Sequence, residues 1–159
     1  MASYPMVLIC GLLFFCIVHA SIVFSVKPLL VCRFEGVVYN RSVPIKWQPV
    51  YWKHGSPKYK WLNKTLCTSV MNALRHNVTL KNALQSCEVT EAKPGSVIAY
   101  SAVLFDGKQL SRRGIDYRKP AFRKALISLI RAYPSYVPSW FYYGKVKSLK
   151  CKTTRLEIA

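Results

Sequence analysis

The stretch Ser96-Val-Ile-Ala-Tyr-Ser-Ala-Val-Leu-Phe105 is apolar and rich in residues that favour β-strands. Asp106-Gly107 follows directly, and this dipeptide is typical of a hairpin turn because glycine adopts a positive φ without steric cost. We therefore expect residues 108–112 to return as a second strand. From Pro120 the period changes, and apolar residues recur at helical spacing at Phe122, Leu126, Leu129, Ile130 and Tyr133. The stretch predicts a β-hairpin followed by an amphipathic helix.

The first twenty residues have the features of a secretory signal peptide. Residues 6–18 form an apolar core, and Val18-His19-Ala20 fits the small-residue rule for cleavage. We expect residues 1–20 to be removed and residues 21–159 to form a single secreted globular domain. The alternative is an uncleaved anchor, because apolar residues continue to Val26 and bring the span close to membrane length.

Cysteine usage also indicates an oxidising compartment. Two of the six cysteines fall in the predicted leader, which leaves Cys32, Cys67, Cys87 and Cys151. An even number in a secreted chain predicts two disulfides, and four cysteines allow three pairings. A bridge between Cys67 and Cys87 would require the chain between them to fold back. The cysteines form no CxxC motif, so we expect no metal site and no cofactor.

Three Asn-x-Ser/Thr sequons, at Asn40, Asn63 and Asn77, predict a glycoprotein. Asn77 presents a conflict, because helical spacing from residue 65 onward places it on the apolar face, where a glycan cannot lie. Either Asn77 carries no sugar or the helix breaks near His76. We expect two short helices, over residues 65–75 and 79–87.

The charge is strongly positive, with 24 Lys and Arg against 6 Asp and Glu and a formal net charge of +18. Such a chain attracts polyanions, which outside cells are sulfated glycans and acidic proteins, and nucleic acid ranks below these as a partner there. The alternative is solvated charge that only keeps the protein soluble. The candidate polyanion-binding residues are Arg112, Arg113, Lys124, Lys145, Lys147, Lys150 and Lys152.

Aromatic residues gather in two segments, 44–62 and 134–143, which are also rich in proline. We expect both segments to be extended or turn-rich. Trp and Tyr dominate binding energy at protein interfaces, although the same side chains can stack on bases or sugars or fill a small core. The candidate partner-binding residues are Trp47, Tyr51, Trp52, Trp61, Trp140 and Phe141.

The pattern of residues 21–43 adds the last elements needed to predict the fold class. Residues 21–43 alternate β-formers with polar residues and predict one or two short strands. Together these elements predict a disulfide-stabilised α+β domain, in which a small antiparallel sheet packs with two to three short helices.

The sequence contains no recognisable catalytic motif, so we expect no enzyme and no catalytic residues. One alternative is a secreted basic nuclease of the pancreatic ribonuclease type, in which two histidines and a lysine act on a phosphodiester. The predicted mature chain has two histidines, His54 and His76, but neither lies in a recognisable catalytic context.

The order of elements from Cys67 onward resembles that of herpesvirus glycoprotein L. The likeness covers about a third of the chain and lies in Cys87, the strand through Val97-Ile-Ala-Tyr100, the turn Asp106-Gly107-Lys108, a return through Tyr117, and the helix opened by Pro120-Ala-Phe122. The cysteine spacing and the high positive charge differ from that family. The resemblance implies a viral envelope subunit that binds and chaperones a membrane-anchored, glycoprotein H-like partner and supports membrane fusion as the virus enters a cell.

The first functional hypothesis is a non-enzymatic glycoprotein of the secretory pathway that binds a larger membrane glycoprotein. It would be secreted, or held at the cell or virion surface by that partner. The second is a cationic secreted effector, either cytokine-like or glycosaminoglycan-binding.

Overall fold

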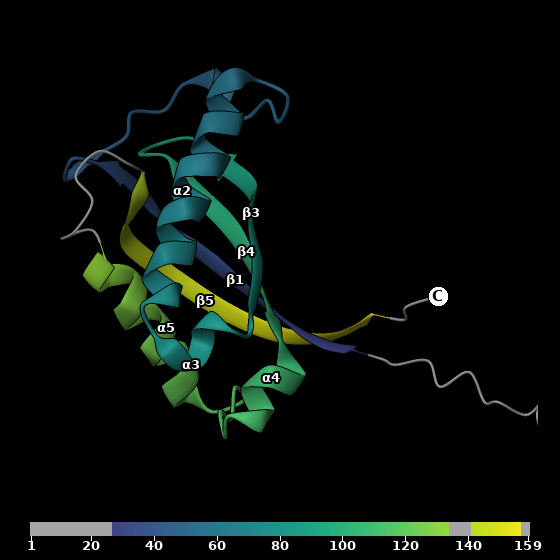
Figure 1. Ribbon diagram of the computed structural model, residues 1–159. Coiled ribbons are helices and arrows are strands. Elements are labelled where there is room, and N and C mark those ends of the chain that lie inside the picture. The colour runs from purple at the N-terminus through teal and green to yellow at the C-terminus, as the bar shows by residue number, and fades with distance from the viewer. Residues whose placement is uncertain (1–26, 134–140, 157–159) are drawn as a thin grey trace, which may run out of the picture.

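The computed structural model of the protein describes residues 27–133 and 141–156 (Figure 1). It confirms an α+β fold with a five-stranded antiparallel sheet and two disulfides. The elements in chain order are β1 (Lys27–Asn40), β2 (Val43–Pro44), the 3-10 turn η1 (Pro49–Tyr51), α2 (Pro57–Arg75), α3 (Val78–Lys81), β3 (Leu84–Lys93), β4 (Ile98–Asp106), α4 (Gly107–Arg112), α5 (Pro120–Ala132) and β5 (Tyr142–Leu156).

The four long strands lie in the order β5–β1–β4–β3, and the short β2 pairs with the end of β1. Two strand–helix–strand halves therefore interleave, which is the split β-α-β pattern of ferredoxin-like folds. This topology fixes where side chains lie, and it does not identify a function.

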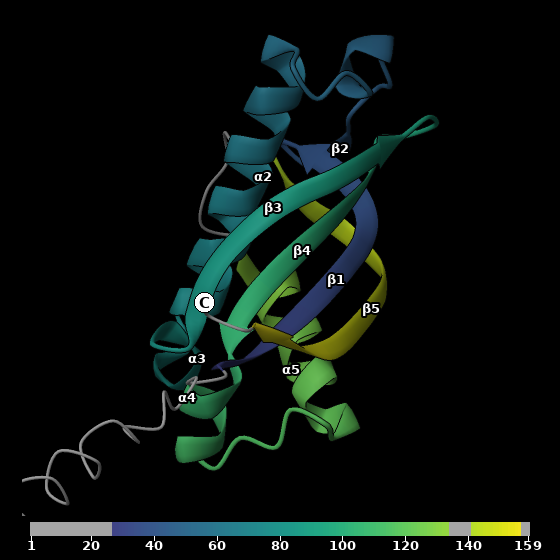
Figure 2. The same cartoon turned by 90° about the vertical axis from the view of Figure 1, so that its right-hand side faces the viewer.

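Helices α2 and α5 pack on the same face of the sheet and against each other (Figure 1). Strand β1 alternates accordingly, with Leu30, Cys32, Phe34 and Val38 buried beneath the helices. No helix covers the opposite face of the sheet (Figure 2). Apart from the buried Ala102, the side chains described on that face are partly or fully exposed. We call this surface the open face.

The structure selects one of the three disulfide pairings. Cys32–Cys151 joins the neighbouring strands β1 and β5, and Cys67–Cys87 joins α2 to β3. The chain does fold back between Cys67 and Cys87, because α2 ends at Arg75 and the single turn α3 reverses its direction.

The predicted hairpin at Asp106-Gly107 is wrong. Residues 107–112 form helix α4, and the Asp106 carboxylate caps it by accepting a hydrogen bond from the Gln109 backbone N–H. A Cβ on Gly107 would lie 2.9 Å from the Pro28 carbonyl oxygen, so this glycine permits a close approach of two chain segments. The actual hairpin joins β3 to β4 through Gly95, whose φ is +111°.

The two helices expected at residues 65–75 and 79–87 are also corrected. Helix α2 begins eight residues earlier, because the Ser56 hydroxyl accepts a hydrogen bond from Tyr59 N–H and Pro57 takes the first helical position. The second helix is only α3, and residues from Leu84 onward form strand β3.

The helix opened by Pro120 is confirmed as α5. In place of the one or two short strands expected over residues 21–43, the structure has one long strand, β1, and the beginning of the short β2. The predicted signal peptide, residues 1–20, lies outside the described residues. None of the helices in the described ranges combines the length and hydrophobicity that crossing a membrane requires.

Candidate interaction surface

The predicted partner-binding aromatics divide into exposed and buried residues. Trp52 and Trp61 are 60% and 53% exposed. Tyr51 and Phe141 are buried core residues, which corrects their assignment to a contact surface. Trp47 is half-buried and packs against the Tyr51 ring at 6.2 Å between centroids. Trp140 lies outside the described residues.

The loop that carries Trp52 is attached to the start of α2. The Ser56 hydroxyl donates a hydrogen bond of 2.6 Å to the Val50 carbonyl oxygen, and the Lys58 ammonium donates to the Gln48 side chain. The His54 ring stacks on Tyr59 at 4.3 Å between centroids. These contacts hold an ordered turn, so the loop presents Trp52 from a defined backbone.

Trp61 lies on the solvent-facing side of α2, opposite the buried Leu62, Leu66 and Val70. Beside it is a hollow of about 130 Å³ lined by Trp61, Lys64, Thr65 and Thr68. Trp52 follows η1 and Trp61 lies in the second turn of α2, so both belong to the end of the molecule where α2 begins (Figure 1). We call Trp52, Trp61 and this hollow the aromatic end.

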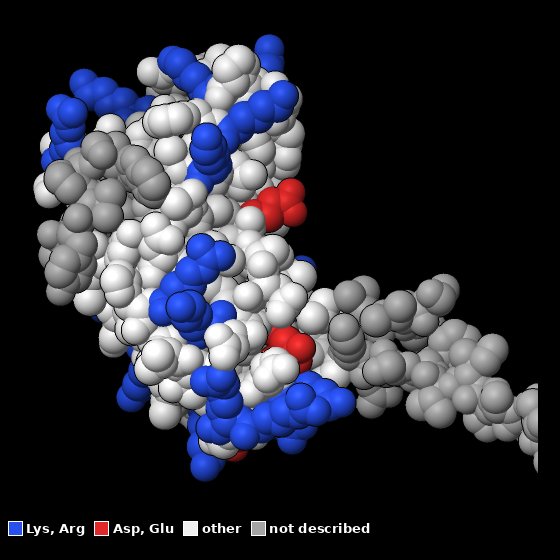
Figure 3. All heavy atoms as spheres, in the orientation of Figure 1, with Lys and Arg blue, Asp and Glu red and all other residues white. Residues whose placement is uncertain are grey.

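Lysines surround the aromatic end, and Lys53, Lys58, Lys60 and Lys64 are all exposed. Figure 3 shows Lys and Arg side chains spread over the helix-covered side of the molecule, from the start of α2 to α4, with few Asp or Glu side chains between them. Within the described ranges the ion pairs are Lys93–Glu91 and Lys119–Asp116. Positive charge therefore dominates this side without forming one patch.

The predicted polyanion-binding residues do not form a single cluster. Arg112 and Arg113 lie at the end of α4, and Lys124 lies on α5, which covers the opposite side of the sheet from the open face. The four lysines Lys145, Lys147, Lys150 and Lys152 are exposed on the edge strand β5.

Strand register adds a residue that sequence reasoning missed. Lys150 pairs with the exposed Arg33, and Lys152 and Lys145 pair with Val31 and Val37, so these three lysines and Arg33 share the open face. On the far strand β3, register places Glu88 and Glu91 on the same face. No pattern within one strand reveals such a pairing, because it depends on register between segments distant in sequence.

The three sequon asparagines have different surroundings, and each is half-buried. Asn40 ends β1, and its side-chain oxygen is buried without a hydrogen bond in the described part of the chain. Asn63 accepts a hydrogen bond of 2.7 Å from the Val89 N–H of β3. Asn77 lies between α2 and α3, where the helix breaks. Such a break near His76 was one of the two alternatives that the sequence left open for Asn77.

The two histidines lie near opposite ends of α2. His54 stacks on Tyr59 and His76 contacts Tyr133 at 5.7 Å between ring centroids. A helix of 19 residues is about 28 Å long. The two rings are therefore too far apart to act on one phosphodiester, and the ribonuclease arrangement is not formed.

Two hydrogen-bonded tyrosines are buried. Burial, and secondarily the Glu88 carboxylate, raises the pKa of the Tyr59 phenol, which donates to the Val89 carbonyl oxygen at 2.5 Å. Burial also raises the pKa of Tyr143. Tyr59 and Asn63 together occupy both backbone groups of Val89, so α2 protects this part of the edge strand β3.

The chain matches no protein-family model and no curated protein sequence.

Proposed function

We propose that the chain is a non-enzymatic interaction module of the secretory pathway that docks on a larger, membrane-anchored glycoprotein through the aromatic end. The observation that carries this proposal is the exposure of Trp52 and Trp61 on an ordered loop and helix. Large aromatic side chains that remain exposed in a folded domain are typical anchors of protein interfaces.

Two disulfides and three sequons support the secretory route. The resemblance to glycoprotein L makes a glycoprotein H-like chain the first partner to test. In that case the module would chaperone its partner and support membrane fusion.

The test is capture of the membrane glycoprotein by the tagged chain from secreting cells, washed in about 1 M salt, where charges are screened beyond about 3 Å. We expect the partner to remain bound to the native chain and to be lost from Trp52→Ala/Trp61→Ala. Both tryptophans are exposed, so the variant should fold. The matched control is Lys53→Ala/Lys60→Ala, which changes two exposed neighbours and should retain the partner. A folded tryptophan variant that keeps its partner contradicts the proposal.

The second candidate function is a cationic effector that binds sulfated glycans through the open face. The cluster of Arg33, Lys145, Lys150 and Lys152 on one surface favours it. Arg33→Gln/Lys150→Gln/Lys152→Gln should elute from heparin at much lower salt than the native chain, because fewer charges meet the polyanion.

The matched control is Arg112→Gln/Arg113→Gln/Lys124→Gln, which removes the same charge from other parts of the surface. Equal shifts in the two variants would show that retention follows net charge alone.

A further inference from the structure

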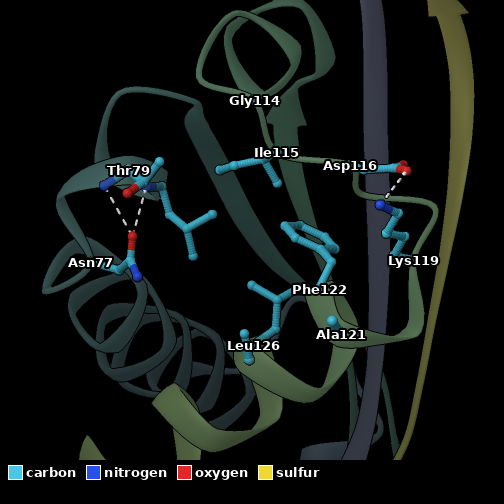
Figure 4. A pocket seen from close by; sticks show the side chains of 11 residues that line it. Asn77, Thr79, Gly114, Ile115, Asp116, Lys119, Ala121, Phe122 and Leu126 are labelled. Atoms are coloured by element: carbon cyan, nitrogen blue, oxygen red, sulfur yellow. Dashed lines mark hydrogen bonds and ion pairs between the residues drawn. The ribbon is translucent and has the colours of Figure 1, made fainter.

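A groove of about 350 Å³ lies between α3, α5 and the loop of residues 114–119. Its volume falls within the range of small-molecule pockets, about 300–1,000 Å³. The walls are apolar, and Figure 4 shows Ile115, Phe122 and Leu126 projecting toward its centre. Asp116 and Lys119, which form an ion pair, lie at one side, and Asn77 and Thr79 lie at the other.

Asn77 and Thr79, which belong to this rim, are the two ends of a sequon. The Asn77 side-chain oxygen caps α3 by accepting hydrogen bonds from the N–H groups of Thr79 and Leu80, at 3.0 and 3.2 Å. The amide nitrogen of Asn77 makes no hydrogen bond to the described part of the chain. The cap therefore fixes the side chain through its oxygen and leaves the nitrogen, where a glycan attaches, unengaged.

The apolar surface around the sequon and the groove also favours a group that covers it. Val78, the middle residue of the sequon, is 77% exposed, and the exposed Ala121 and Ala125 line the groove from α5. An apolar hollow beside an exposed valine is unfavourable in water. A pyranose ring has apolar C–H faces and an acetamido methyl, which suit such walls, and it has hydroxyls for the polar rim.

We propose that Asn77 is glycosylated and that its first N-acetylglucosamine lies in this groove, against Ile115, Phe122 and Ala125. The inference rests on the secretory route of the proposed function. In the transfer, the Asn77 amide nitrogen bonds to the anomeric carbon of a lipid-diphosphate oligosaccharide. The bond from that carbon to the diphosphate oxygen breaks, and one amide proton is released. The attached sugar then covers the groove as part of the folded surface.

The experiment uses the full chain secreted from cells fed N-acetylglucosamine that is labelled with ¹³C in its acetyl group. The glycans of the secreted chain are then trimmed to one sugar per site. Thr79→Ala removes the sequon but keeps the Asn77 cap, so the acetyl signal that disappears belongs to Asn77. We expect nuclear Overhauser cross-peaks from that methyl to the Phe122 ring and the Ile115 methyl groups.

A matched pair of variants tests whether the sugar lies in the groove. Ala125→Lys places a charged chain in the groove and should reduce these cross-peaks to background while Asn77 remains glycosylated. Ser128→Lys adds the same charge to an exposed position of α5 outside the groove and should leave them unchanged.

Four results would overturn the inference. Sugar at Asn40 or Asn63 but not at Asn77 would contradict it and leave the secretory route intact. An occupied Asn77 whose methyl shows no contact with Phe122 would place the glycan in solvent. A secreted chain without sugar at any sequon would also contradict it, whereas failure of the chain to enter the secretory pathway would contradict the proposed function as well.

Discussion

Tyr143 is the largest fully buried side chain in the described residues, and its hydroxyl makes a polar contact inside the core. The hydroxyl shares a hydrogen bond of 2.6 Å with Ser101 Oγ and donates to the Ala99 carbonyl oxygen at 3.2 Å. These bonds connect β5 to β4 across the intervening strand β1. A buried hydroxyl of this kind is costly to leave without a partner.

Removing one partner should therefore cost more than removing both. Tyr143→Phe leaves the buried Ser101 hydroxyl without its partner and should lower the free energy of unfolding by about 1–3 kcal/mol. Adding Ser101→Ala should recover part of this loss, so the double variant is more stable than the sum of the single variants predicts. Urea denaturation of the four proteins measures the coupling. If the stability losses of the two single variants simply added, the result would contradict a stabilising hydrogen bond between Tyr143 and Ser101.

The same tyrosine predicts a pH dependence. Burial raises the pKa of the Tyr143 phenol above its ordinary value of 10.0, and the Ser101 hydrogen bond offsets this only in part. Below pH 10 the phenol is protonated in the folded and unfolded chains, so its contribution to stability is constant. Above pH 10 the unfolded chain releases the proton first, so stability falls as pH rises. The slope of unfolding free energy against pH above 10 should be shallower in Tyr143→Phe, and equal slopes would contradict this assignment.

At the scale of elements, the pairing of β1 with β5 depends on a close approach at Gly36. The register between these strands shifts after Glu35, and a Cβ on Gly36 would lie 2.6 Å from both the Lys145 carbonyl oxygen and the Tyr143 ring. The clash with backbone cannot be relieved by rotating a side chain.

Gly36→Ala should therefore destabilise the fold by about 1–3 kcal/mol, the usual cost of overpacking. Gly55→Ala is the matched control, because nothing lies within 4 Å of its added Cβ. Thermal unfolding of both variants gives the comparison. If Gly36→Ala were as stable as Gly55→Ala, the β1–β5 register would be wrong.

The elements differ in how well sequence predicts them. Helix α5 was predictable, because Pro120 marks its start and its apolar period lasts over three turns. The start of α2 was missed because its first two turns hold the exposed residues Lys58, Lys60 and Trp61, which interrupt the apolar stripe. The dipeptide Asp106-Gly107 was wrongly predicted as a hairpin turn, because Asp is equally suited to cap a helix. The close approach of Gly107 to Pro28 could not be predicted, because the two residues are distant in sequence.

At the scale of the molecule, two disulfides constrain segments of very different length. Cys32–Cys151 spans 119 residues and joins the first and last strands, whereas Cys67–Cys87 spans 20 residues and joins α2 to β3. A longer closed loop restricts the unfolded chain more strongly.

Replacing each pair by serine should show this difference. Loss of Cys32–Cys151 should lower the free energy of unfolding by about 5 kcal/mol and loss of Cys67–Cys87 by about 3 kcal/mol, from loop-closure entropy. Denaturant titration of both double variants measures the order. A larger loss from Cys67–Cys87 would show that local contacts outweigh the constraint on the unfolded state.

The candidate surface was only partly predictable for the same long-range reason. The composition predicted that aromatic residues form the contact surface, but it could not tell which of them are exposed. Trp52 and Tyr51 are neighbours in sequence, and only Trp52 is exposed. Arg33 joins the β5 lysines only through a register of strands more than a hundred residues apart. Burial and register both arise from tertiary packing, which a single sequence does not display.

The measurement that tests the central proposal most directly is expression of the tagged chain in secreting cells, alone and together with candidate membrane glycoproteins. We expect the chain to be retained or surface-bound with one membrane glycoprotein in a fixed ratio. This complex should survive high salt and should be lost in Trp52→Ala/Trp61→Ala. Abundant free monomer in the medium, with no partner bound in high salt, would contradict it and favour a cationic effector acting through the open face.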